Sequence, residues 1–265
     1  CMGINSDPGI DHLSVRMGVN LLPLLREIFN HYAVQHGALS GLPNDEECRR
    51  LIYPSEDWFE QFPKVAEGRL SPGVIDKEVN QLRKRIHLFE NACAQQGLTI
   101  RQVYAAFLKC HELFLEPQGE FHWFFDSMQL MHCEGSFLFI HAGVDDHLAD
   151  LLQQHSIAQL NQIYQQQLHG DLFGFYYGPF ANATQTKYRA LDFPLTDQGV
   201  ESLQKQSLHA VVHGHRSRIG GQRIVQRQGL LHIEGDVKLN RNSRAKLGVS
   251  GHGIGATIIR PEGQV

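Results

Sequence analysis

The architecture of this chain is set by a short run that reads FLFIHAG over residues 137–143. Four apolar residues predict a β-strand, which delivers His141 at its carboxyl end and is followed at once by two small residues. Active sites of layered α/β folds gather where strands end, because loops there hold polar groups above a rigid sheet. We expect Ala142 and Gly143 to leave room beside the imidazole for a ligand or a metal ion.

A second run repeats this arrangement nearer the C-terminal end. It reads AVVHGHR over residues 210–216, so an apolar strand ends in a glycine turn that presents His215 and Arg216. The first run also belongs to a predicted β-hairpin, because residues 128–133 and 136–141 flank a Glu-Gly turn signal. Around these runs the pattern predicts helices over 145–155, 156–168 and 200–206, and strands over 209–213, 223–227, 229–234 and 256–260.

Together the two runs resemble the calcineurin-like metallophosphoesterases, in the branch that contains the phosphoprotein phosphatases and the diadenosine-tetraphosphate hydrolases. That family has a strand ending in His-Ala-Gly or His-Gly-Gly, and a later strand ending in Gly-His. Here these are His141-Ala142-Gly143 and Gly214-His215, and the resemblance covers about 125–265. It implies an α/β fold in which this chain forms part of a layered β-sandwich flanked by helices, with a large helical insertion.

The resemblance implies a phosphatase that hydrolyses phosphate esters through a dinuclear metal centre and a metal-bound hydroxide. Two divalent ions, manganese, iron or zinc, are the implied cofactors, and His141 and His215 are the implied ligands of one of them. Two ligands of one ion must converge in the fold. Paired ions clamp the attacking and leaving oxygens of an in-line displacement. A phosphorylated small molecule or a phosphoprotein is the implied substrate.

The other metal ligands of that family come from Asp-x-His, Gly-Asp-x-x-Asp-Arg and Gly-Asn-His motifs that precede the first histidine strand. Asp145-Asp146-His147 matches the first pattern but follows His141, where an Asp helix cap is the simpler interpretation. Gly235-Asp236 lacks the downstream Asp-Arg pair. The catalytic residues are therefore expected upstream of Cys1, and this chain alone is expected to be inactive.

Two arginines are candidate substrate ligands. Arg189 precedes the Gly-His strand in the region where family members place a phosphate-contacting arginine, and Arg216 directly follows His215. A guanidinium fork suits a phosphate group, and a solvated surface position is the alternative for each.

Two other functions remain open from the sequence. In one, His141, His213 and His215 form a mononuclear zinc site that activates a single water. The resemblance instead predicts that His213 is not a ligand. In the other, the chain is a non-catalytic scaffold built on a phosphatase fold.

The first part of the chain has a different sequence pattern. We predict a mainly helical segment over 1–118, with about 12–116 as the insertion or lid, and an α/β half over 119–265. Helices are predicted over 18–37, 74–96 and 100–115, the last with Thr99 as its N-cap, and Pro63, Gly68, Pro72 and Gly73 predict a loop.

Composition bounds the class of protein. The net charge of −4 lacks the basic excess of a nucleic-acid-binding protein, and no apolar stretch is long enough to span a membrane. The five cysteines are odd in number and form no Cys-x-x-Cys pair, which favours a reducing compartment. The expectation is a cytoplasmic phosphatase without nucleic-acid or membrane partners.

Overall fold

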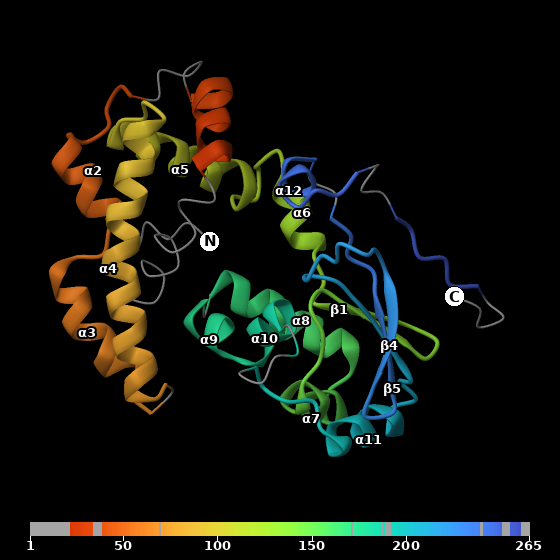
Figure 1. Cartoon of the computed structure of the whole chain (residues 1–265). Helices are drawn as coiled ribbons and strands as arrows, with labels where there is room; N and C mark the ends of the chain where they lie inside the picture. The colour runs from red at the N-terminus through yellow and green to blue at the C-terminus, as the bar shows by residue number, and fades with distance from the viewer. Residues whose placement is uncertain are drawn as a thin grey trace. The chain divides into compact units, whose positions relative to one another are not determined.

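The structure is a computed structural model, and it describes residues 22–33, 39–68, 70–170, 172–186, 188, 192–238, 241–250 and 255–260. The chain divides into two compact units, Cys1–Met128 and Gln129–Val265, whereas the sequence placed the division at residue 118. The first unit consists of helices, and the second combines a sheet with helices (Figure 1).

The first unit opens on residues 22–28, which are α-helical and continue into the π-helix η1 (Phe29–Ala33). The helices that follow are α2 (Asp45–Ile52), α3 (Glu56–Ala66), α4 (Pro72–Gln95), α5 (Ile100–Phe114) and α6 (His122–Ser127). The two helices predicted over 74–96 and 100–115 are confirmed as α4 and α5. Helix α5 begins where expected because Thr99 and Gln102 form a reciprocal capping box.

Helices α2 and α3 were not predicted, although both have regular N-caps. The side chains of Asn44 and Ser55 accept hydrogen bonds from backbone N–H groups in the first turns of these helices. Pro63, expected in a loop, lies inside α3. Proline removes one N–H donor, but the apolar face of α3 is held by Trp58 stacked on Phe62, both buried. Tertiary packing therefore outweighs the local breaker.

The second unit is built on a five-stranded mixed sheet. Its strands are β1 (Met131–Glu134), β2 (Phe137–Ile140), β3 (Ala210–His213), β4 (Arg223–Arg227) and β5 (Leu230–Glu234), in the order β1-β2-β3-β5-β4. Strands β2, β3 and β5 are parallel, and the two edge strands pair antiparallel with their neighbours. The unit is therefore α/β, and the predicted hairpin is confirmed, with Gly135 at φ +56° in its turn. The carboxyl ends of the three parallel strands meet at one edge.

The helices of this unit are α7 (Asp146–Gln154), α8 (Ile157–His169), α9 (Leu172–Tyr177), α10 (Pro179–Gln185), α11 (Asp197–Lys205) and α12 (Arg241–Lys246). Helices α7, α8 and α11 confirm the sequence prediction, and α9 and α10 occupy a segment to which the sequence assigned no element. The strand predicted over 256–260 is wrong, since these described residues join no ladder. An extended run becomes a strand only when a partner backbone satisfies its N–H and C=O groups.

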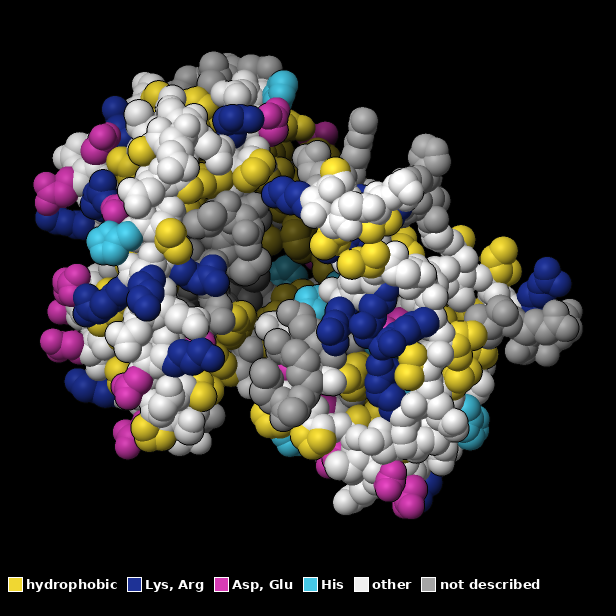
Figure 2. All heavy atoms as spheres, in the orientation of Figure 1, with side chains coloured by type: hydrophobic (Ala, Val, Ile, Leu, Met, Phe, Trp, Pro, Cys, Tyr) yellow, Lys and Arg dark blue, Asp and Glu magenta, His cyan; other side chains and the backbone are white. Residues whose placement is uncertain are grey.

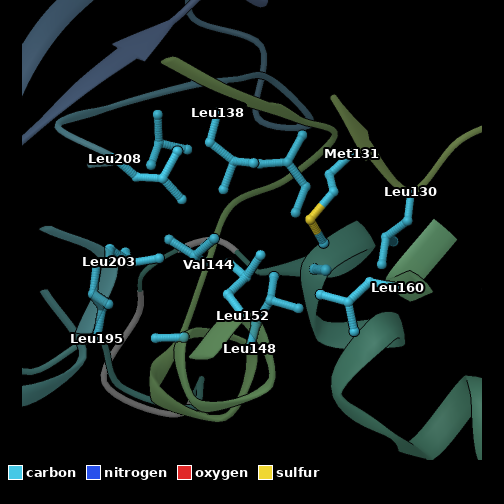
Figure 3. Close-up of a cluster of buried hydrophobic side chains, with 14 of the residues drawn as sticks. Leu130, Met131, Leu138, Val144, Leu148, Leu152, Leu160, Leu195, Leu203 and Leu208 are labelled. Carbon is cyan, nitrogen blue, oxygen red and sulfur yellow. The ribbon is translucent and has the colours of Figure 1, made fainter. Parts of the chain in front are cut away.

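The core of the second unit lies between the sheet and its helices. Figure 3 shows Leu138 of β2, Leu148 of α7 and Leu203 of α11 among the side chains that meet there, and each is fully buried. Leu138 alternates with the half-buried Phe137 and Phe139, as the two-residue period of a strand requires. This buried face fixes the register of β2, and so fixes where the residue after the strand emerges.

Across the parts of the chain that the structure describes, no helix is both long and apolar enough to cross a bilayer.

Candidate functional site

His141 and His215 meet at the carboxyl edge of the sheet. His141 directly follows β2, and His215 follows β3 after a single glycine. The Nε2 atom of His141 lies 3.1 Å from the Nδ1 atom of His215, and the ring planes are inclined by 64°. Because β2 and β3 are parallel neighbours, their ends emerge side by side. The predicted convergence of the two histidines is confirmed.

The spacing of this histidine pair fits two ligands of one ion. Two imidazole nitrogens bound at about 2.0–2.1 Å in a tetrahedral site lie about 3.3 Å apart. The observed separation also fits a hydrogen bond between two neutral rings, with the tautomers deciding donor and acceptor. Within the described residues, no group of three or more His, Cys, Asp and Glu side chains is placed to hold an ion. Among the described residues, the histidine pair would amount to two of the four ligands of a tetrahedral site.

The loop that carries His215 has an unusual backbone. The φ angle of His215 is +63°, in the left-handed region that residues other than glycine seldom adopt. Backbone hydrogen bonds hold this loop: the Gly214 N–H donates to the His141 carbonyl at 2.9 Å, and the Arg216 N–H donates to the Gly214 carbonyl at 2.7 Å. The first bond ties the two histidine loops directly to each other.

The glycines beside the histidines serve close packing. Gly143 has φ +144°, and the hydroxyl of Tyr188 occupies the position that a Cβ atom there would need. That hydroxyl accepts a hydrogen bond from the Val144 N–H at 3.0 Å. At Gly214 an added Cβ would lie 3.0 Å from the Cβ of Asp236. The expectation that Gly143 leaves room for a ligand is wrong, because Tyr188 fills the space.

An open pocket of about 650 Å³ borders the histidine pair. It is lined by the ends of three parallel strands, at His141, Gly214–His215 and Gly235–Asp236, and by Phe139 and Val212 of the sheet. The volume suits a small molecule.

The sequence pattern indicates no role for Asp236, because Gly235-Asp236 lacks the downstream Asp-Arg pair. The structure brings it to the pocket of the histidine pair, since β5 is parallel to β3 and Asp236 follows its end just as His215 follows that of β3. The signal was present in the sequence as a third strand ending in a glycine and a polar residue. It could be interpreted only once the parallel pairing was known.

His213 belongs to a different pair. Its Nε2 atom lies 3.1 Å from the Nδ1 atom of His232, and both side chains are buried. Burial lowers the pKa of His213 to about 4 and that of His232 to about 3, so both rings are neutral at neutral pH. The three-histidine alternative therefore loses one member to a separate cluster.

No protein-family model, curated protein or solved structure matches this chain. The interpretation of the site thus depends on its own geometry, which consists of two converging imidazoles, three aligned strand ends and an open pocket.

The other candidate residues from the sequence lie in different environments. Arg216 is exposed directly after His215, and Arg189 lies outside the described residues. Asp145 is the N-cap of α7, accepting a hydrogen bond from the Leu148 N–H at 2.8 Å and another from the Asn182 amide. The literal Asp-x-His match is therefore a helix start, as the sequence analysis expected.

Proposed function

We propose that this protein is a metal-dependent phosphatase of the calcineurin-like metallophosphoesterase class, acting on phosphate esters with two divalent ions. The proposal is supported chiefly by the 3.1 Å approach of His141 Nε2 to His215 Nδ1 at the ends of neighbouring parallel strands. A hydrogen bond between two side chains at a solvent-accessible rim adds only about 1 kcal/mol to stability. The left-handed backbone of His215 turns its ring toward His141 at a cost of about 1–2 kcal/mol, and a shared ion would add to what a hydrogen bond returns.

In this proposal the two histidines hold one ion through neutral imidazole nitrogens, and the other ligands come from beyond the described residues. When bound, divalent ions polarise phosphoryl oxygens and lower the pKa of a metal-bound water to about 7, so that hydroxide is available at neutral pH. The contribution of Arg216 is to contact the phosphate with its guanidinium. A phosphorylated small molecule or a phosphoprotein is the proposed substrate class, with manganese, iron or zinc as the metal.

The finer fold proposal is a layered β-sandwich of which the second unit contributes one sheet. Leu138 and Val211 are buried in the helix-covered core, whereas Phe139 and Val212, at alternate positions, are half-buried and line the open pocket. A second sheet packed on this face would bury them. The free thiols of Cys48, Cys93, Cys110 and Cys133 accord with the reducing compartment that we propose, the cytoplasm.

Metal titration tests the proposal directly. Manganese and zinc are titrated into the 265-residue chain, into His141→Ala and His215→Ala, and into His209→Ala as a control that removes an exposed histidine elsewhere in the same unit. Each site variant should lose affinity about tenfold or more, because one of two ligands is gone, while the control keeps that of the wild type. An intact fold that binds no metal would instead support the scaffold alternative.

Activity provides a second readout. With p-nitrophenyl phosphate and manganese, the 265-residue chain should show no turnover, because two neutral imidazoles cannot hold two cations close together. Turnover that persists in His141→Ala and in His215→Ala would mean that the active site lies elsewhere.

A further inference from the structure

Three arginines converge on one carboxylate beyond the histidine pair. Glu234, the last residue of β5, accepts hydrogen bonds from Arg218 Nε at 3.0 Å, from Arg223 Nε at 2.6 Å and Nη2 at 3.1 Å, and from Arg227 Nη2. Arg218 belongs to the loop after β3, and the other two to edge strand β4. The Glu234 side chain is only 6% exposed, so the cluster is built around a buried centre.

The charges of this arginine cluster do not balance. Three guanidiniums and one carboxylate leave an excess of two positive charges. In the part of the chain that the structure describes, no other carboxylate pairs with these arginines. Like charges held together repel, and partly buried guanidiniums have also lost hydration, so the arrangement is costly without an anion. One well-placed arginine would already satisfy Glu234.

One donor of the cluster has no hydrogen-bond partner among the described residues. The Nη1 atom of Arg227 is buried and makes no hydrogen bond to any residue that the structure describes, an arrangement that native structures usually resolve with a bound ion or water. The Arg227 guanidinium also stacks over the Tyr188 ring, at 4.5 Å from its centroid. A pocket of about 490 Å³ opens beside it and is lined further by Phe193, Gln226 and Gln228.

The other two arginines are accessible. The side chain of Arg223 is 44% exposed and that of Arg218 is 24% exposed. Figure 2 shows Lys and Arg side chains gathered on the surface of the second unit, in the region of β4. Donors held in place by Glu234 need no further ordering when a ligand arrives, which favours binding.

We propose that Arg218, Arg223 and Arg227 form an oxyanion site whose ligand is a phosphoryl dianion, carried by a small molecule or free in solution. The charge of the dianion equals the excess of the cluster, and planar guanidinium forks match the tetrahedral oxygens. The site needs no metal and does not depend on the phosphatase proposal. A molecule bound there through its phosphoryl group can extend into the pocket beside Arg227.

The test is calorimetric titration of the 265-residue chain with inorganic phosphate and with phenyl phosphate, in a buffer containing EDTA so that no metal site contributes. Wild type should bind both. Arg223→Gln should weaken binding about tenfold, since a charge-assisted contact is lost. Arg50→Gln, which removes the same charge from an exposed position in the first unit, should bind as wild type does. The double variant His141→Ala with His215→Ala should also bind as wild type does.

Near-ultraviolet circular dichroism checks that the variants fold, and Arg218→Gln repeats the test from a second arginine. Tighter binding of phenyl phosphate than of phosphate would identify a phosphorylated molecule as the ligand, and equal binding would identify the free anion. Either result supports the site. Absence of phosphate binding by wild type, or undiminished binding by both folded arginine variants, would overturn it.

Discussion

The hydroxyl of Tyr188 lies against Gly143, in the place where any side chain at residue 143 would have to stand. Gly143→Ala should therefore destabilise the second unit by about 1–3 kcal/mol, because Tyr188 is displaced and the backbone is left at an unfavourable φ. Urea denaturation measures the change. The matched control is Gly73→Ala in α4, where an added Cβ meets nothing, so stability should be unchanged or slightly higher. Equal midpoints for the two variants would contradict this account of Gly143.

The positive φ of His215 predicts a second stability effect. His215→Gly should be more stable than His215→Ala by about 1 kcal/mol, since glycine adopts the left-handed conformation without strain. Both variants lack the imidazole, so both should lose the proposed metal affinity equally. Thermal unfolding beside the metal titration separates the two effects. An alanine variant as stable as the glycine variant would show that the loop relaxes to another conformation.

His213 should be dispensable for metal binding. His213→Ala removes a buried ring that contacts His232, so stability should fall by about 1–3 kcal/mol while metal affinity stays within about twofold of wild type. His215→Ala should give the opposite pattern. Loss of metal by the folded His213 variant would restore the three-histidine site as the better interpretation.

The buried pair formed by His213 and His232 predicts acid sensitivity. Their folded pKa values of about 4 and about 3 lie below the unfolded value of 6.5, because burial disfavours the charged ring. As pH falls below about 6.5, the unfolded chain takes up protons that the folded chain does not, so stability decreases. Each ring contributes a slope of about 1.4 kcal/mol per pH unit, and the decrease continues until the folded pKa is passed.

Glu234 acts in the same direction at lower pH. Burial alone would raise the pKa of its carboxyl, but hydrogen bonds from three arginines hold it below its usual range. The histidine pair therefore contributes a decrease in stability between pH 6.5 and 4.5. Denaturation midpoints across this window should depend less on pH in His232→Gln than in wild type, with His209→Gln as the exposed control. A slope unchanged in His232→Gln would show that these rings do not cause it.

The sequence predicted the parts of the site that depend on local pattern. Apolar runs that end in His141 and in Gly214-His215 identify strand ends whatever the rest of the chain does. Asp236 and Glu234 could not be assigned in this way, because their positions depend on the parallel pairing of β5 with β3, and pairing leaves no local mark. Tyr188 was missed for a related reason, since it lies in a segment without helical or strand periodicity.

The fold was predictable to a similar extent. The long helices α4 and α5 show several turns of apolar periodicity, whereas α2 is short and strongly polar, and its N-cap is the main local signal. The run over 256–260 has the composition of a strand but no ladder. Its composition indicates a preference for the extended conformation, but a strand forms only where a neighbouring backbone pairs with it.

The order of the strands along the chain has a consequence for synthesis. Strands β1 and β2 form a hairpin early, but the free edge of β2 is covered only by β3, which follows after helices α7 to α11. Until Ala210–His213 leaves the ribosome, the backbone N–H and C=O groups along that edge of β2 are open to pairing with another chain. Fragments that stop after α11 should therefore aggregate, and the arrival of β3 is the event that protects the unfinished chain.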